Sequence, residues 1–318
     1  MTNKLENLSW KPAWVSHLGC IKGCLDYLKV DISDAWLFGG TGHAFIINIH
    51  EVICPSGPTA WNTEMLFKLG KNLGYRINGV CALKSNHDFV EKRKFAWEHT
   101  KRALDKGLPC YGWELDIPEY YVVYGYDDTG YYFSGPGCDS GKGPKPWQEL
   151  GESKIGVLEM FWVKPGQAAD DIKTVKEAFE LVLEHSRNPS KWIFPKYKSG
   201  LAGYDNWIHA LENGDANGFG MAYNAAVWSE CRTHAVQFLK EVKPRINGQL
   251  SSLFDEALSH YETVARKLKN VSETFPFPPK GDEVEDSDRC NKGLKDLRAA
   301  QQAEKLGLET LEKIRSEL

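Results

Sequence analysis

The feature that most limits the possible folds of this chain is a change of character near residue 165. Before this point glycine is dense, and short β-branched and aromatic runs alternate with helical stretches. After it, apolar residues recur at the spacing of amphipathic helices. The segment KPGQAADD (164–171) joins the two parts, because Pro and Gly interrupt regular structure and Asp170 or Asp171 can cap the next helix. The sequence therefore predicts two domains, 1–165 and 166–318.

The first half reads as helices followed by antiparallel strands. We expect helices over 20–29, 59–73 and 85–107, and a glycine-rich turn leading into a strand over 37–52. An aromatic hairpin is expected over 118–136, with its turn at DDTG (127–130). The helices of the second half each have one apolar face, which an antiparallel bundle would bury, and 275–289 is expected to be a loop between two of them. The predicted fold class is α+β: an N-terminal domain with an antiparallel sheet, then an all-α helical C-terminal domain.

Composition and charge exclude several classes of protein. Hydrophobic residues make up 42% and charged residues 26%, as in ordinary globular proteins. The net charge of −4 and the lack of a basic run give no electrostatic basis for binding nucleic acid. No apolar run approaches the roughly 18–20 residues of a membrane span, and the opening MTNKLENLSWKPAW has no apolar core of a secretory signal. We expect a cytoplasmic protein with no nucleic-acid or membrane partner.

The eight cysteines give no sign of a metal or redox site. They are scattered, with no CxxC pair and no cluster of histidines, so a zinc site is not predicted. GGTG (39–42) lacks the Lys-Ser/Thr step of a phosphate-binding loop. The sequence thus predicts no metal and no cofactor, and most of the cysteines are expected to be free, buried thiols.

Two segments resemble known families. SHLGCIKGCLDYLKVDISDAWLFGGTG (16–42) resembles the opening of the butirosin biosynthesis protein H N-terminal family, whose pattern is a His-Cys pair, an apolar helix and a Ser-acid step into a glycine-rich turn. PEYYVVYGYDDTGYYFSGP (118–136) is similar to the papain-like leader peptidases that process double-glycine peptides, in which a His opens one strand and a second strand ends in Asn-Asp-Pro. Both families have a papain-like fold, in which a Cys at a helix N-terminus meets a His on a neighbouring strand. The resemblance covers residues 10–165 and implies a papain-like N-terminal domain.

The catalytic positions implied by this resemblance are altered. Aligned without gaps through Asp31-Ile32-Ser33, the nucleophile position falls on Ser16 and the His position on Glu119. The orienting Asp falls on Gly135, and Cys20 lies one helical turn after Ser16. A carboxylate raises the pKa of a nearby thiol and disfavours the thiolate. A carboxylate paired with a serine also lacks the imidazole that ordinarily moves the proton.

A shorter first helix would place a different set of residues at these positions. Cys20 would then be the nucleophile, activated by the helix N-terminus, and His43 or His17 would be its base. We take Cys20, His43 and Glu119 as the candidate catalytic residues. The structural alternatives are a buried helix thiol for Cys20, a histidine bonded to turn backbone for His43, and a strand-edge carboxylate for Glu119.

Candidate ligand contacts lie around the same positions. They are Ser16, His17, Glu114 and Tyr121. Glu114 and Asp116, in GWELD, could meet a cationic or amine-bearing ligand beside the expected cleft. The structural alternatives are a helix cap for Ser16 and solvated strand charges for the two carboxylates.

Two functions remain open from the sequence. In the first, the altered papain-like domain binds a peptide or an amine-bearing small molecule and does not catalyse a reaction. In the second, the protein is a cysteine-dependent acyltransferase or amide hydrolase that acts through a thioester on Cys20. For this second function the butirosin-type resemblance implies acyl transfer from an acyl carrier protein to an amino sugar. The role of the helical half and the oligomeric state are not predicted.

Overall fold

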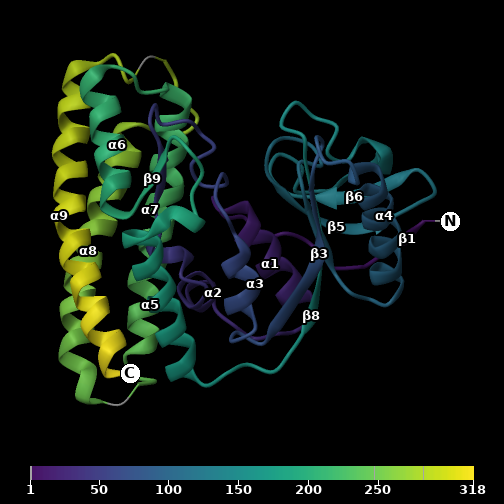
Figure 1. Cartoon of the computed structure of the whole chain (residues 1–318), viewed down its shortest axis with the longest axis horizontal. Coiled ribbons are helices and arrows are strands. Elements are labelled where there is room, and N and C mark those ends of the chain that lie inside the picture. The colour runs from purple at the N-terminus through teal and green to yellow at the C-terminus, as the bar shows by residue number, and fades with distance from the viewer. Residues whose placement is uncertain (1, 247, 282) are drawn as a thin grey trace. The chain divides into compact units, whose positions relative to one another are not determined.

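The computed structural model describes residues 2–246, 248–281 and 283–318. Over these residues the chain is mixed α+β, with a seven-stranded antiparallel sheet and a helical C-terminal region, as the sequence predicts (Figure 1). The chain forms two compact units. The first unit contains the residues up to Ile32 together with Gly74–Ala168, and the second contains Ser33–Leu73 and Ala169–Leu318.

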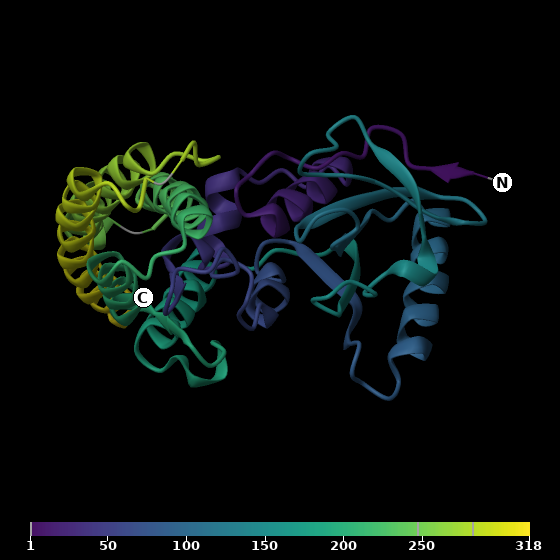
Figure 2. The ribbon, with the colours of Figure 1, turned by 90° about the horizontal axis from the view of Figure 1, so that it is seen from above.

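The first unit is built around the sheet. Its strands run in the order β3-β8-β4-β5-β6-β7, and β1 pairs with β5. The strands are β1 (Asn3–Lys4), β3 (Tyr75–Leu83), β4 (Cys110–Trp113), β5 (Tyr120–Tyr126), β6 (Gly130–Ser134), β7 (Lys142–Pro146) and β8 (Val157–Pro165). Helices α1 (Ser16–Tyr27) and α4 (Phe89–Asp105) lie on opposite faces of this sheet (Figures 1 and 2).

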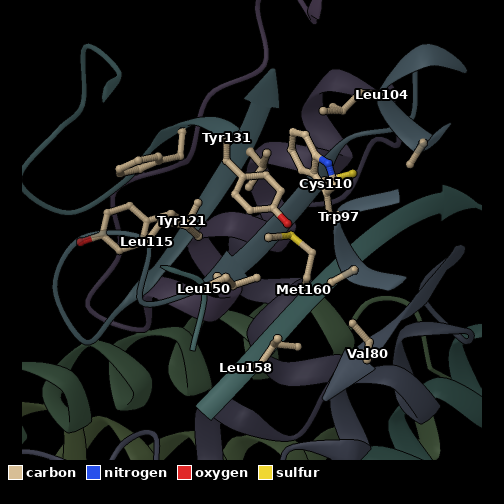
Figure 3. Close-up of a cluster of buried hydrophobic side chains, with 14 of the residues drawn as sticks. Val80, Trp97, Leu104, Cys110, Leu115, Tyr121, Tyr131, Leu150, Leu158 and Met160 are labelled. Carbon is tan, nitrogen blue, oxygen red and sulfur yellow. The ribbon is translucent and has the colours of Figure 1, made fainter. Parts of the chain in front are cut away.

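The main core of this unit lies between the sheet and α4. Successive strand residues point to opposite faces, so alternate side chains of the central strands reach the same layer. Cys110 of β4, Tyr121 of β5, Tyr131 of β6 and Met160 of β8 meet Trp97 of α4 there (Figure 3). The other face of the same strands is left for α1, and the candidate site lies on that side.

The predicted aromatic hairpin is present as β5 and β6. Its turn is held by Asp127, whose carboxylate accepts the N–H groups of Thr129 at 2.8 Å and Gly130 at 3.1 Å. An Asp that accepts backbone N–H groups two and three residues ahead is the expected chemistry of such a turn. The hairpin brings the end of β6 beside the start of β5, with Ser134 opposite Val122.

The second unit is predominantly helical. Its elements are α2 (Asp34–Gly40), η1 (His43–Phe45), β2 (Asn48–His50), α3 (Glu64–Gly70), α5 (Asp171–Arg187), η3 (Pro189–Lys191), β9 (Tyr197–Ser199), α6 (Gly200–Asn213), α7 (Gly218–Val242), η4 (Gly248–Leu250), α8 (Ser251–Thr274) and α9 (Ser287–Glu317). Strands β2 and β9 form a small antiparallel pair. Among the helices that the structure describes, none combines the length and the apolar character needed to cross a bilayer.

The division into units differs from the predicted boundary, because Ser33–Leu73 belongs to the helical unit. The stretch predicted as a turn and strand begins as helix α2, whose start is capped by the Ser33 hydroxyl accepting the Trp36 N–H at 2.9 Å. Gly39 explains why α2 packs on α7: a Cβ at this position would lie 2.0 Å from the ring of Phe238. Two helices can approach this closely only where one of them has a glycine. Gly39 and Phe238 are about 200 residues apart in the sequence, so no local sequence pattern predicts their contact.

Helix boundaries also differ from the predictions. α1 begins at Ser16 rather than at residue 20, and α3 covers only Glu64–Gly70 of the expected helix over 59–73. The predicted loop over 275–289 lies between α8 and α9 and extends to residue 286; residue 282 is outside the described residues. The early start of α1 matters for the site, since it places Ser16 rather than Cys20 at the helix N-terminus.

Candidate functional site

Ser16 and Glu119 meet in the first unit, although they are far apart in sequence. Ser16 is the first residue of α1, and its hydroxyl donates a hydrogen bond to a carboxylate oxygen of Glu119. The same hydroxyl accepts the backbone N–H of Tyr120 at 3.0 Å. Ser16 does not cap its own helix, whose N-cap is Val15 without a side-chain hydrogen bond. The serine therefore ties the N-terminus of α1 to the start of β5.

The third aligned position, Gly135, has no room for a side chain. A Cβ there would lie 2.5 Å from Cδ1 of the Tyr121 ring. Tyr121 is fully buried in the core, and its hydroxyl accepts the Ile117 N–H at 3.1 Å and donates to the Pro136 carbonyl at 3.2 Å. A side chain at position 135 would therefore collide with the tyrosine ring. Tyr121 supports the site from the core, whereas the sequence placed it among the ligand contacts.

His17 lies in an aromatic layer next to Ser16. Its ring stacks on Tyr120 with centroids 3.9 Å apart, and its Nε2 atom is 3.1 Å from the Tyr111 hydroxyl. The Tyr120 hydroxyl in turn donates a hydrogen bond to Glu159. His17 is 4% exposed. These contacts hold its imidazole between α1 and the sheet.

Cys20 is buried one turn inside α1. Its side chain has no exposed surface, and burial raises the pKa of the thiol well above its ordinary value, with smaller contributions from the Cys24 thiol and the Glu119 carboxylate. The nucleophilic form of cysteine is the thiolate, which this environment disfavours. The shorter first helix that would place Cys20 at the nucleophile position is not present. Cys24 is also buried, with its thiol directed to the Cys110 carbonyl at 4.0 Å.

His43 belongs to the second unit, whereas Cys20 belongs to the first. Its Nδ1 atom is 3.7 Å from the Cys231 thiol, and its ring meets Trp61 edge-on with centroids 5.5 Å apart. Burial lowers the pKa of His43 to about 3. In this setting the imidazole is a neutral group in the core of the helical unit. This is close to the alternative given by the sequence, in which His43 has a structural role and is not a catalytic base.

Acid is expected to destabilise the second unit through His43 and a second buried histidine, His185. Burial lowers the pKa of His185 to about 4. As pH falls below about 6.5, the unfolded chain binds protons that the folded unit rejects, so stability is lost progressively toward pH 4. Between pH 7 and pH 5, His185 alone accounts for a loss of about 2 kcal/mol.

Urea titrations of the wild type and a His185→Phe variant at several pH values measure this effect. The variant keeps an aromatic ring against Trp61, which the wild-type imidazole meets edge-on at 5.4 Å. We expect the stability of the variant to fall less steeply as the pH is lowered, because its unfolding takes up about one proton fewer than that of the wild type. Equal slopes for the two proteins would show that His185 titrates normally in the folded unit.

Carboxylates cluster on the bend that leads from β4 into β5. Glu114 lies in the left-handed region with φ +56°, donates its N–H to the Glu119 carbonyl at 2.8 Å, and accepts the Ser153 hydroxyl at 2.6 Å. Asp116 pairs with Lys142 at 2.7 Å. A non-glycine residue with positive φ is uncommon, and such residues concentrate at functional sites. Glu114 and Glu119 thus belong to one hydrogen-bonded turn.

Two further residues of this face were missed by sequence reasoning. Glu159 of β8 accepts the Tyr120 hydroxyl, and burial raises the pKa of its carboxyl group. Trp113 of β4 meets Tyr120 with ring centroids 5.0 Å apart, and its buried indole N–H has no hydrogen-bond partner. Glu159 is a single acid in the apolar strand VLEMFWV, which is the signal that could have identified it.

An open surface pocket of about 270 Å³ reaches Ser134, the neighbour of Gly135. It is lined by residues 4–9, Tyr124, Ser134 and residues 139–141. Ser134 precedes Gly135, is 3% exposed, and its hydroxyl has no hydrogen-bond partner. A buried hydroxyl without a partner costs free energy unless something bonds to it. Within the described part of the chain, no three His, Cys, Asp or Glu side chains are arranged to hold a metal ion.

No protein-family model matches the sequence, and no curated protein is significantly similar to it.

Proposed function

We propose that the first unit is a papain-like domain that binds a peptide or an amine-bearing small molecule and does not catalyse a reaction. The observation on which this rests is the hydrogen bond from Ser16 to Glu119. Positions that would hold a cysteine and a histidine in a leader peptidase meet here as a serine and a glutamate. The proposal includes the cytoplasmic location expected from the sequence.

The arrangement of the elements supports the papain-like part of the proposal. Ser16 begins a helix, Glu119 immediately precedes a strand, and Gly135 immediately follows the neighbouring strand, which ends at Ser134. These are the three places at which a papain-like enzyme has its nucleophile, base and orienting residue. The ungapped alignment assigned them from sequence alone, and all three come from the first unit.

The chemistry of the site favours binding over catalysis. A serine hydroxyl has to lose its proton to attack a carbonyl, and a carboxylate is a weak base for this purpose at neutral pH. Without a histidine to receive the proton and return it to the leaving group, no acyl transfer cycle is supported. Cys20 does not replace Ser16, because its thiol is buried and protonated. We therefore do not propose a thioester on Cys20.

The polar groups of the site favour an ammonium group as the ligand feature. Glu114 and Glu119 lie on one turn, and both are half-buried, so their carboxylates are not closed off from solvent. Carboxylates attract ammonium groups. Peptides and small amines share this group.

Calorimetric titration of the full chain with spermidine and with tetraglycine tests the binding proposal. We expect at least one of the two to bind, and Glu119→Gln to weaken it about tenfold, since a charge-assisted hydrogen bond is lost. Glu91→Gln is the matched control, because Glu91 is an exposed glutamate on α4 and its replacement changes the net charge equally. Binding of neither probe, or equal binding by both variants, would overturn the proposal.

A peptidase assay tests the absence of catalysis separately. The full chain is incubated with a peptide containing a double-glycine step, and products are followed by mass spectrometry. We expect no cleavage. Cleavage that disappears in a Ser16→Ala variant would show that the serine is a nucleophile and would contradict this part of the proposal.

A further inference from the structure

The two edges of the seven-stranded sheet are built differently. Edge strand β7 has the sequence KGPKP, with two prolines and two lysines, and its pairing with β6 is interrupted by a register shift. Proline, lysine and bulges are the usual devices that prevent a sheet edge from pairing with another chain. Edge strand β3 has none of them: YRINGVCAL contains no proline and a single charge, and its nine residues pair with β8 without a bulge.

The outer side of β3 presents backbone groups for pairing. The Lys84 N–H donates to the Gly156 carbonyl at 2.8 Å, on the side of β8. The Leu83 N–H points the other way and is bonded by the Asn86 side chain at 2.6 Å. Because successive residues of an antiparallel strand alternate, the N–H and C=O groups of Ile77, Gly79 and Cys81 also point away from β8.

The side chains around this edge leave it accessible on both faces of the sheet. Asn78 on one face, and Gly79, Cys81 and Leu83 on the other, are all exposed. Leu83 is 53% exposed, which is high for a leucine in a strand. A long, exposed edge with apolar side chains is a site for strand pairing.

We propose that two copies of this chain pair through their β3 strands, antiparallel and two-fold symmetric about Gly79. In this register Ile77 lies opposite Cys81 and Asn78 opposite Val80 of the second copy, while the Leu83 N–H at the end of the strand keeps its bond to Asn86. The only charged residue of the strand, Arg76, faces Ala82, so no like charges meet. A two-fold axis makes such a contact self-complementary, since each outward N–H of β3 in one copy faces a C=O of β3 in the other copy. This inference is independent of the proposed ligand site.

Sedimentation velocity of the full chain over about two orders of magnitude in concentration tests the pairing. We expect a concentration-dependent dimer in the wild type. Ile77→Lys adds a charge on the outer edge and is expected to raise the dimer dissociation constant at least about tenfold. Val90→Lys is the control, because Val90 is a 65% exposed residue on α4 and the change of chemistry is the same. A monomer at all concentrations, or a dimer equally stable in both variants, would overturn the proposal.

A disulfide trap tests the register. With Ile77→Cys, the introduced thiol should face Cys81 of the second copy at a separation that a disulfide can span. Oxidation is expected to give a covalent dimer in which peptide mapping finds a bond between positions 77 and 81, and Cys81→Ala in the same protein should remove it. A bond at other positions only would contradict this register. A monomeric chain that instead binds an extended peptide along β3 would show that the partner is not a second copy.

Discussion

Replacing Ser16 by Cys and Glu119 by His together is expected to create a thiol that iodoacetamide alkylates about a hundredfold faster at pH 6 than the thiol of the single Ser16→Cys variant. The introduced thiol would begin α1, where the helix N-terminus favours a thiolate, and would adjoin an imidazole at the position that now bonds Ser16. In the single variant the neighbouring group is the Glu119 carboxylate, which disfavours the thiolate. The ratio of the two alkylation rates therefore reports whether a thiol at position 16 and an imidazole at position 119 lie close enough to interact.

Peptide mapping separates this reaction from that of the eight native cysteines. Cys20, Cys24, Cys110 and Cys231 are buried, and burial raises their pKa values, so they react slowly. Glu119→His alone is the control, since it introduces the imidazole without the thiol. Equal rates for the double and the single variant would mean that positions 16 and 119 do not meet as a papain-like enzyme requires.

The same double variant is expected to remain inactive as a peptidase. Turnover also needs a third group to orient the imidazole. At Gly135 that group has no space, because the Tyr121 ring lies 2.5 Å from where a Cβ would be. We therefore expect fast alkylation without peptide cleavage, because positions 16 and 119 meet while position 135 has no room for a third group.

The Ser16–Glu119 pair could be found from sequence because both residues lie in short patterns with fixed spacing. The aromatic hairpin was equally predictable, since the Asp127 turn is a local device. Helix α2 was not, because its two terminal glycines resemble a turn, while its burial depends on the contact between Gly39 and Phe238. Local sequence shows where chain elements begin and end, but not which distant helix they meet.

The partners of buried polar residues were the other feature that sequence could not supply. His43 was placed beside the nucleophile because it lies in a glycine-rich turn near it in sequence, yet its contact is with Cys231, 188 residues away. Glu159 meets Tyr120 only because β8, β4 and β5 are adjacent in the sheet. Strand order is decided by packing of the whole unit, so pairings of this kind follow from the fold and not from residue spacing.

Replacing Arg232 by Met is expected to destabilise the second unit by about 3–5 kcal/mol, the usual result of breaking a buried ion pair by removing one partner. Arg232 of α7 and Glu304 of α9 are fully buried and joined at 2.8 Å. Arg232 also donates to the carbonyls of Ala44 and Ile46 at 2.9 and 2.8 Å, and Tyr204 donates to Glu304 at 3.1 Å. The substitution would leave a buried carboxylate without its cation and two buried carbonyls without their donor.

Urea unfolding followed by tryptophan fluorescence measures this loss, and the double variant Arg232→Met with Glu304→Leu identifies its cause. If the cost comes mainly from the stranded charge of Glu304, removing that charge should recover part of the stability, leaving about 1–3 kcal/mol for the unpaired carbonyls of Ala44 and Ile46. A loss below about 1 kcal/mol in the single variant would contradict a fully buried pair, because only exposed pairs are worth so little.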